Sequence, residues 1–434
     1  MTISSSLNAG VAGLNANANR LAAIADNIAN SSTYGYKREE TDFQNVVITG
    51  SSQSSYSAGG VRVSSLRLID DRGPLISTTN STDLAIDGRG FLPVTDITAL
   101  DNGDGTYPIS LVTTGSFRPD SAGVLRTETG MVLMGWPANP DGSIDDFPRD
   151  SMTGLEPVRI NASQYIANPT TKVSLGVNLP ATETAAGALG QSYTLPVEYY
   201  GNLGTSESLS FTFVPTVAAT GSSNTWTMTI TDSASGGAVV GQYSMVFDGS
   251  QATGGRLATV TAISGGAYDA DTGSIDLALT GGSITLSLGK LGGKDGMTQL
   301  SSTFAPVSVS KDGSPVATLT SVEVDELGYL NAIYDQGFTR TIYQLPVVDV
   351  PNPNGLISLS NQTYEVSPAS GPFYLWDAGD GPTGAVVGFS REESATDVAA
   401  ELTQLIQTQR AYSSNAKVIQ TVDEMLQETT NLKR

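Results

Sequence analysis

The residue types that most often carry catalysis are missing from this chain of 434 residues. It contains no His and no Cys, so the commonest general base, the commonest metal-binding ring and all thiolate chemistry are excluded. Carboxylates are the remaining candidates, and three adjacent pairs stand out: Asp70/Asp71, Asp145/Asp146 and Glu392/Glu393. Neighbouring residues of an extended strand point to opposite faces, so we interpret these pairs as solubilising charges.

Two turn-like motifs could hold a ligand, and neither fits one. The acidic stretch Asp101–Gly105 lacks the ligand spacing of a calcium loop, and Asn, Asp and Gly are the ordinary residues of a solvated turn. Gly88-Arg-Gly90 lacks the third glycine and the helix of a dinucleotide loop. We therefore predict no catalytic residue, no metal, no cofactor and no enzymatic activity. The alternative, a glycosidase, would need two carboxylates that converge in a cleft.

The charge balance excludes several classes of partner. The net charge is −21 and only 15% of the residues are charged. Clustered Lys and Arg are required to neutralise phosphates, so we expect no nucleic acid partner. No segment approaches the roughly 20 apolar residues of a membrane span, and Met1–Gly10 has no basic or apolar signal-peptide region. We expect no membrane insertion and no cleaved signal peptide.

Both ends of the chain carry apolar residues that alternate spacings of three and four. The N-terminal stripe consists of Leu7, Val11, Leu14, Ala18, Leu21, Ala25 and Ile28. The C-terminal stripe consists of Val398, Leu402, Leu405, Gln409, Tyr412, Ala416, Ile419, Asp423 and Leu426, widened by Ile406, Val418, Val422 and Met425. This is the a/d pattern of helices that form coiled coils. Ser394 and Asp397 are the candidate N-caps of the second helix.

These narrow, Ala-rich stripes have two interpretations. The helices could be core elements that clamp one domain. Alternatively, each buries too little surface to be stable alone and becomes ordered against other copies of the chain. We favour the second interpretation, because the helices lie at opposite ends of a long chain whose middle shows no helical period. We predict that both ends are disordered in the monomer and fold on polymerisation.

The middle of the chain has the pattern of a β protein. Period-two alternation marks Ser208–Val214, Thr225–Thr231 and Ser283–Leu288, and turns rich in Gly, Asn and Asp separate such runs. Many short strands indicate sandwiches or barrels. The predicted organisation is an N-terminal helix and turn (1–38), a flexible linker (39–65), a β-rich domain (66–150 with 304–390), an inserted β-rich domain (151–303) and a C-terminal helix (391–434).

The two ends resemble the flagellar rod, hook and hook-associated axial proteins. In Leu21–Arg38, an Ile-Ala-Asn run and a Thr-x-Gly-aromatic-Lys turn match the family's N-terminal signature, at Asn30, Thr33, Gly35, Tyr36 and Lys37. Asp26 and Ser32 stand where the family more often has Asn. The C-terminal signature is carried by Gln409, Arg410, Ala411, Tyr412 and Asn415. Asp83–Phe91, Gly115–Gly130 and Asn352–Leu356 are similar to internal family segments, so the resemblance covers about half of the chain.

The resemblance implies a fold and a function. The fold is mainly β with helical termini that pair as a coiled coil, inside β-rich outer domains. The long insertion favours a hook subunit over a distal rod or hook–filament junction protein, and over a β-rich adhesin. The implied subunit polymerises into a flexible hollow tube and transmits motor torque. Its partners would be itself, the rod and junction proteins, the hook cap and the type III export apparatus. Its location would be the flagellar hook and basal body, outside the cell.

The site expected from this resemblance is an assembly interface on the terminal helices. Its residues are Leu7, Val11, Leu14, Leu21, Ile24, Ile28, Val398, Leu402, Leu405, Ile406, Tyr412, Ile419 and Leu426. Gly35 should adopt a positive φ after the first helix, which would make the Thr33–Lys37 turn a joint between helix and strands.

Overall fold

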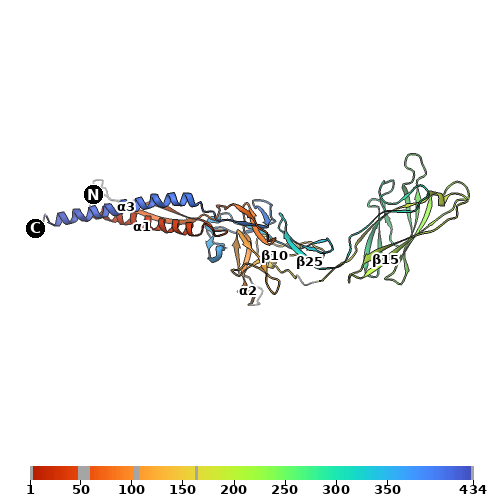
Figure 1. Ribbon diagram of the computed structural model, residues 1–434, viewed down its shortest axis with the longest axis horizontal. Coiled ribbons are helices and arrows are strands. Elements are labelled where there is room, and N and C mark those ends of the chain that lie inside the picture. Colours follow the sequence, from red (N-terminus) through yellow and green to blue (C-terminus); the bar gives the residue numbers. More distant parts are fainter. Residues whose placement is uncertain (1–2, 47–58, 102–106, 162–164, 432–434) are drawn as a thin grey trace. The chain divides into compact units, whose positions relative to one another are not determined.

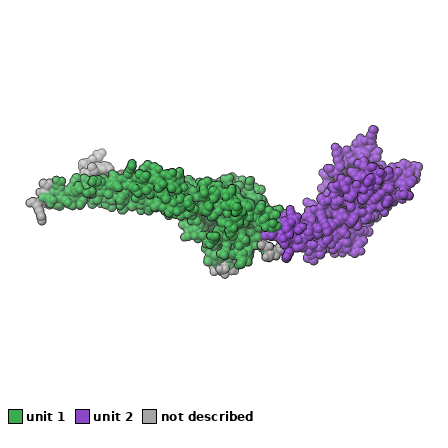
Figure 2. Space-filling model, in the orientation of Figure 1, with its two compact units in different colours: residues 1–162, 320–333, 339–434 green, residues 163–319, 334–338 purple. Residues whose placement is uncertain are grey.

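The computed structural model describes residues 3–46, 59–101, 107–161 and 165–431, and it divides into two compact units. Unit 1 comprises residues 1–162, 320–333 and 339–434, and unit 2 comprises residues 163–319 and 334–338 (Figure 2). Strands make up most of the regular structure of both units, and the long helices lie at the chain ends. No helix in the described ranges is both long and apolar enough to cross a bilayer.

The terminal helices of unit 1 pack side by side (Figure 1). Helix α1 spans Ile3–Ala29 and α3 spans Val398–Asn431. They run antiparallel, because Gly10 near the start of α1 lies against Ile419 and Asn27 near its end bonds to Glu401. The paired terminal helices predicted from the sequence are confirmed.

The start of α3 follows the predicted cap. Asp397 Oδ1 accepts hydrogen bonds from the backbone N–H groups of Ala399 at 2.9 Å and Ala400 at 3.2 Å. These are two of the amides that an α-helix leaves without an internal partner. The prediction of Asp397 as an N-cap is therefore confirmed.

The segment predicted as a flexible linker contains a β-hairpin. Strand β1, Glu39–Asn45, pairs antiparallel with β2, Val61–Arg67, over seven residue pairs. The hairpin packs on α1, where a Cβ on Gly60 would lie 3.1 Å from Ala12 Cβ. The Ser-rich composition that suggested a linker belongs mainly to residues 47–58, which lie outside the described residues.

The β body of unit 1 is built around one buried strand. The residues of β10 from Met131 to Trp136 are all buried, because neighbours cover both faces of the strand. The strands are β3 Leu75–Ser77, β4 Asp83–Asp87, β5 Leu92–Asp96, β6 Ile109–Val112, β7 Thr114–Ser116, β8 Arg118–Pro119, β9 Leu125–Arg126, β10 Met131–Pro137, β11 Glu156–Pro157, β25 Leu319–Val324, β26 Tyr329–Tyr334, β27 Thr339–Gln344, β28 Val347–Asp349, β29 Ile357–Ser358, β30 Tyr364–Glu365, β31 Tyr374–Trp376, β32 Ala385–Gly388 and β33 Ser390–Glu392. Short helical segments span Ile97–Asp101 (α2), Pro353–Gly355 and Ser360–Gln362.

Unit 2 has two main sheets that enclose one aromatic core. The first has the order β14-β15-β16-β17-β18, and the second contains β19, β20, β21, β13, β22 and β23. The strands are β12 Ile166–Asn168, β13 Lys172–Leu179, β14 Tyr193–Tyr200, β15 Ser206–Pro215, β16 Thr225–Asp232, β17 Ala238–Phe247, β18 Leu257–Ser264, β19 Tyr268–Asp269, β20 Ser274–Leu279, β21 Gly282–Ser287, β22 Thr298–Gln299, β23 Ala305–Lys311 and β24 Ser314–Ala317, with a 3-10 turn at Ala181–Thr184. Alternate residues of β16 are buried, as the period-two pattern predicts.

The boundaries of the inserted unit differ from the sequence-based ones because of strand pairing. Strand β11 pairs with β10, and Val124 forms a bridge to Arg159, so residues 151–160 belong to unit 1. At the other end, β23 pairs with β13 over Val173–Asn178 and keeps residues 305–311 in unit 2. Pro157 and Pro306, two of the prolines that suggested the boundaries, lie inside paired strands.

Candidate assembly interface at the chain ends

The signature turn after α1 depends on a glycine. Gly35 has φ of 69°, as predicted, and its N–H donates to the carbonyl of Glu392 at 2.8 Å. A Cβ at this position would lie 2.9 Å from Thr114 Cγ2. Thr33 Oγ1 donates to Asn30 Oδ1 at 3.2 Å, which closes the turn locally. The turn therefore fixes how the chain passes from α1 into the β body.

Asn27, on the last turn of α1, ties three segments together. Its Nδ2 donates to the Glu39 carbonyl at 2.9 Å and to Glu401 Oε1 at 3.1 Å, and its Oδ1 accepts from the Glu39 N–H at 2.8 Å. The Tyr36 hydroxyl donates to Asp26 Oδ2 at 3.0 Å and lies 3.1 Å from Asn27 Oδ1. One buried amide thus joins α1, β1 and α3.

Burial changes the acidity of two groups around Asn27. Desolvation raises the pKa of Glu401, and its Oε2 is buried without a hydrogen-bond partner. Desolvation, together with the hydrogen bond to Asp26, raises the pKa of the Tyr36 hydroxyl and keeps it a donor. The hydrogen bond from the Asn27 side chain offsets only part of the cost of burying Glu401.

A buried ion pair joins the two ends of the chain beside the turn. Lys37 Nζ lies 2.6 Å from Glu392 Oε1, and the two side chains are 0% and 1% exposed. Lys37 also donates to the Asp71 carbonyl at 2.6 Å, and the N–H of Gly73 donates to Glu392 Oε1. Desolvation lowers the pKa of Lys37 to about 8, against the opposing effect of Glu392. The interpretation of the Glu392/Glu393 pair as solubilising charges is wrong for Glu392, because tertiary packing buries it.

The seam between α1 and α3 differs from the predicted stripe at most positions, although the stripe residue Ile419 contacts Gly10 within it. On α1 it consists of Gly10, Gly13, Asn17, Arg20, Ile24 and Asn27, and on α3 its most buried positions follow the series Glu401, Thr408, Asn415 and Val422. Except for Ile24 and Val422, these residues are small or polar. Each of these positions directly precedes a stripe residue. One residue advances an α-helix by roughly 100°, so the stripe residues that directly follow a seam position, such as Leu21 and Leu402, are turned about a quarter turn away from the seam.

Six of the thirteen predicted interface residues are exposed. The exposed fractions are 43% for Val11, 38% for Val398, 47% for Leu402, 51% for Ile406, 40% for Tyr412 and 39% for Leu426. The half-buried residues are Leu7, Leu14, Leu21, Ile28, Leu405 and Ile419, and Ile24 is buried in the seam. Of the C-terminal signature, Gln409, Arg410 and Ala411 are exposed, and Asn415 lies in the seam against Gly13.

Helix direction places the two stripes on one side of the pair. Both helices are viewed here from the same end. The residue that follows a seam position is rotated clockwise about the axis of α1, and anticlockwise about the axis of α3, because the two helices are antiparallel. Since the two seams face each other, Leu21 and Leu402 then point to the same side. Ala12, one residue before Gly13, lies on the opposite side, under the hairpin. We name the side that carries Leu21, Ile28, Val398, Leu402 and Ile406 the apolar side.

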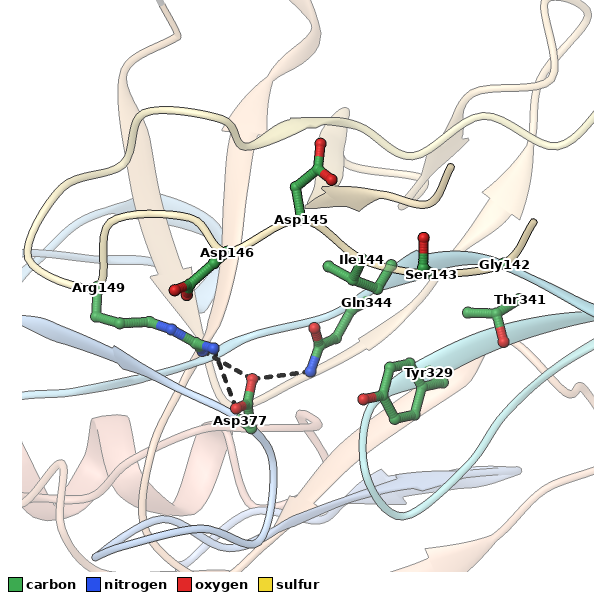
Figure 3. Close-up of a pocket in the computed structure, with 10 residues that line it drawn as sticks. All are labelled: Gly142, Ser143, Ile144, Asp145, Asp146, Arg149, Tyr329, Thr341, Gln344 and Asp377. Carbon is green, nitrogen blue, oxygen red and sulfur yellow. Dashed lines mark hydrogen bonds and ion pairs between the residues drawn. The ribbon is translucent and has the colours of Figure 1, made fainter. Parts of the chain in front are cut away.

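Elsewhere in unit 1, a structural cluster of side chains lines one hollow. Arg149 donates to both carboxylate oxygens of Asp377, at 2.7 and 3.1 Å, and Gln344 Nε2 donates to Asp377 Oδ1 at 2.8 Å (Figure 3). The exposed pair Asp145/Asp146 lines this hollow. Among the described residues, no group of three Asp or Glu side chains could hold a metal ion. Most of the acidic stretch Asp101–Gly105, which we interpret as a solvated turn, lies outside the described residues.

Sequence reasoning missed Asn27, Glu392 and Glu401, which have the closest polar contacts of the site. A usable pattern existed only for the seam of α3, because Glu401, Thr408, Asn415 and Val422 repeat every seven residues. Their polarity hid that repeat behind the more apolar stripe. Nothing in the sequence distinguishes buried Glu392 from exposed Glu393.

Comparison with known proteins gives consistent matches at both ends and over the full length. Residues 7–37 match the family described as "Flagella basal body rod protein", and residues 387–432 match "Flagellar basal body rod FlgEFG protein C-terminal". The chain is 33% identical to the flagellar hook protein FlgE of Brucella suis over 438 residues, with 100% of both chains covered. The corresponding protein of Rhizobium meliloti is also 33% identical, over 441 residues and 100% of both chains.

More distant proteins match over most of their length. The flagellar hook protein FlgE of Salmonella typhimurium is 28% identical over 436 residues, with 98% of each chain covered. Among solved structures, the Helicobacter pylori flagellar hook protein FlgE2 superposes with a TM-score of 0.46 at 15% identity, covering 72% of this chain and 98% of that chain.

Proposed function

The chain belongs to the flagellar hook protein family, and we propose that it is the structural subunit of a bacterial hook. In this proposal it polymerises through its terminal helices into a hollow, flexible tube that transmits motor torque to the filament. It acts as a structural protein and catalyses no reaction. The observation that carries the proposal is the apolar side of the α1–α3 pair, which stays uncovered while small and polar residues form the seam.

The energetics favour a second copy of the chain as the occupant of the apolar side. Burying an exposed Leu or Ile side chain contributes about 1.5–3 kcal/mol. The seam contributes less apolar area, because Gly10, Gly13, Asn17 and Thr408 present little apolar surface. A polymer contact that covers Leu402, Ile406 and their neighbours therefore adds stabilisation that one chain lacks. Because the seam buries little apolar area, the disorder of both ends in the monomer remains a prediction.

The remaining assignments rest on the family. The tube would lie in the flagellar hook and basal body, outside the cell, after type III export that needs no cleaved signal peptide. Rod proteins and hook–filament junction proteins would bind its two ends, and the hook cap and the export apparatus would act during assembly. The absence of Cys suits export as an unfolded chain, because no disulfide has to be opened.

Assembly of the purified full chain tests the proposal directly. Electron microscopy under polymerising conditions should show that the chain with its natural sequence forms tubes. The double variant Leu402→Gln/Ile406→Gln should keep its circular dichroism spectrum and form no tubes. Thr403→Asn/Gln407→Asn, at exposed polar positions of the same turns, should still form them. Normal tubes from the Leu402/Ile406 variant would contradict the assigned interface, and no tubes from the natural chain would contradict the function.

Limited proteolysis tests the predicted disorder. In the monomer, cleavage should remove about 30–70 residues from each end and leave a stable β core. The same protease should leave the ends of assembled tubes intact. Equal protection of both ends in dilute monomer would overturn the prediction.

A further inference from the structure

Helix α3 carries a second exposed apolar pair, on the side away from Leu402. Val418 is 45% exposed and Met425 is 46% exposed. Val418 precedes the seam residue Ile419 by one position, whereas Leu402 follows the seam residue Glu401 by one position. The two side chains are therefore turned by roughly 100° from the seam in opposite directions. Around the helix axis, Met425 is rotated by about 60° from Val422, in the direction in which Val418 is rotated from the seam.

The two apolar pairs are also separated along the helix axis. Leu402 and Val418 are 16 positions apart, and Ile406 and Met425 are 19 positions apart. At about 1.5 Å per residue, these separations correspond to roughly 24–29 Å. The helix pair thus presents two apolar surfaces, on opposite sides and at different heights.

We infer that Leu402 and Ile406 of one copy pack against Val418 and Met425 of the next copy. The inference rests on the proposed function and specifies the contact. Neighbouring α3 helices run parallel and are shifted along their axes by roughly 24–29 Å. The contact joins different surfaces of the two copies, so each copy keeps its other surface free for a further copy. Such contacts build rings or open helical arrays.

A contact between identical surfaces fits the structure less well. Packing Leu402 against Leu402 of a second copy would form a closed pair and would leave Val418 and Met425 exposed. The Leu402 surface also lacks exposed charge. From Val398 to Gln409 the only charged residue is Glu401, and it is buried in the seam, so no exposed charge of this segment opposes an apolar partner.

Disulfide trapping can test the contact, because the natural chain has no Cys. Tubes of the full chain carrying Leu402→Cys and Val418→Cys are oxidised and separated on a denaturing gel without reductant. The second pair is Ile406→Cys with Met425→Cys, in case the first pair weakens assembly. The matched control is Leu402→Cys with Ala416→Cys. Ala416 is exposed but follows the seam residue Asn415, on the same side as Leu402.

The expected result is a ladder of dimers and higher oligomers from at least one of the two proposed pairs, and none from the control pair. Each single variant should give no ladder, and a mixture of the two single variants should give dimers only. Intact tubes without a ladder from either pair, or an equal ladder from the control, would overturn the contact but not the proposed function. Dimers from Leu402→Cys alone would also overturn it, in favour of the closed pair.

Helical reconstruction of the natural tubes gives a second readout. The axial offset between the contacting α3 helices should be roughly 24–29 Å. An offset below about 15 Å or above about 40 Å would place Val418 out of reach of Leu402 and would overturn the inference.

Discussion

Lys37 Nζ and Glu392 Oε1 lie 2.6 Å apart in a site that excludes water from both side chains, although 355 positions separate them in the sequence. Lys37 belongs to the turn that follows α1, and Glu392 belongs to the strand that precedes α3. The ion pair therefore links the segment that follows α1 to the segment that precedes α3, in addition to the contacts along the seam. This link sets where the helices leave the β body.

Removing the charge of Glu392 should destabilise unit 1 strongly. Glu392→Gln leaves Lys37 buried without its counter-charge, and breaking a buried pair in this way costs about 3–5 kcal/mol. Glu393→Gln is the matched control, since the neighbouring side chain is exposed and surface changes stay within about 0.5 kcal/mol. Urea denaturation of both variants measures the difference. Equal stabilities would show that the pair does not support the fold.

The stability of unit 1 should rise in mild alkali. The pKa of Lys37 is about 8 in the folded chain and near 10.5 when unfolded, so between these values the unfolded chain binds more protons. The free energy of unfolding contributed by this group therefore increases from pH 8 towards pH 10.5 and is constant below pH 8. Denaturation of the natural chain and of Lys37→Met at pH 7.5, 8.5 and 9.5 measures it. The difference in favour of the natural chain should grow with pH; a shrinking difference contradicts the assignment.

Asn27→Ala should loosen the junction of both helices with the hairpin. The substitution leaves the Glu39 backbone groups and Glu401 without their partner, and each buried unsatisfied group costs about 1–3 kcal/mol. Asn19→Ala, at an exposed position of the same helix, should have little effect. Hydrogen exchange of the β1 amides reports the junction locally. Unchanged protection in the Asn27 variant would contradict the role assigned to it.

Glu401 should weaken the fold when it ionises. Its pKa is raised by desolvation, so the folded chain binds the proton more tightly than the unfolded chain. The stability that this carboxyl group contributes is present below its ordinary pKa and is lost as the pH rises through the raised value. Glu401→Gln keeps an oxygen for Asn27 and removes this loss. The variant should gain stability relative to the natural chain between pH 4 and pH 7; a constant difference would refute the prediction.

A large residue at Gly13 should separate the helix pair. Even a Cβ there would lie 2.7 Å from Asn415 Nδ2, so the side chain of Gly13→Leu has no room in the seam. Overpacking of this kind costs about 1–3 kcal/mol. Ala22→Leu adds a comparable side chain at an exposed position of α1 and should be tolerated. Faster exchange of the α1 amides in the Gly13 variant alone is expected, and equal exchange in both variants would argue against close packing.

Several elements follow from local sequence. The three-and-four spacing predicts both long helices, and Asp397 predicts where the second begins, because helix amides without internal partners require a nearby acceptor. Gly35 predicts a left-handed turn, because glycine has no Cβ and adopts a positive φ at little cost. The alternation in Thr225–Thr231 predicts a half-buried strand. Each of these depends on residues a few positions apart, and the sequence contains that information directly.

The domain boundaries required the tertiary structure. Prolines near residues 137–157 suggest a break, but a break exists only where strands stop pairing, and pairing depends on distant partners. Strand β11 folds back onto β10. Strand β23 pairs with β13 although more than a hundred residues separate them. The hairpin at 39–67 was hidden for a related reason, because α1 covers strands whose polar residues resemble a linker.

The sequence by itself determined that the chain has two amphipathic ends, a β-rich middle and no residues for His or Cys chemistry. Only the tertiary structure decided which side of each helix meets the other. The helices pair along small and polar positions, one residue before the apolar stripe, because Gly10 and Gly13 let the backbones approach and Asn27 and Glu401 find partners there. A heptad pattern marks a surface that must be covered, but it does not say whether the covering segment belongs to the same chain.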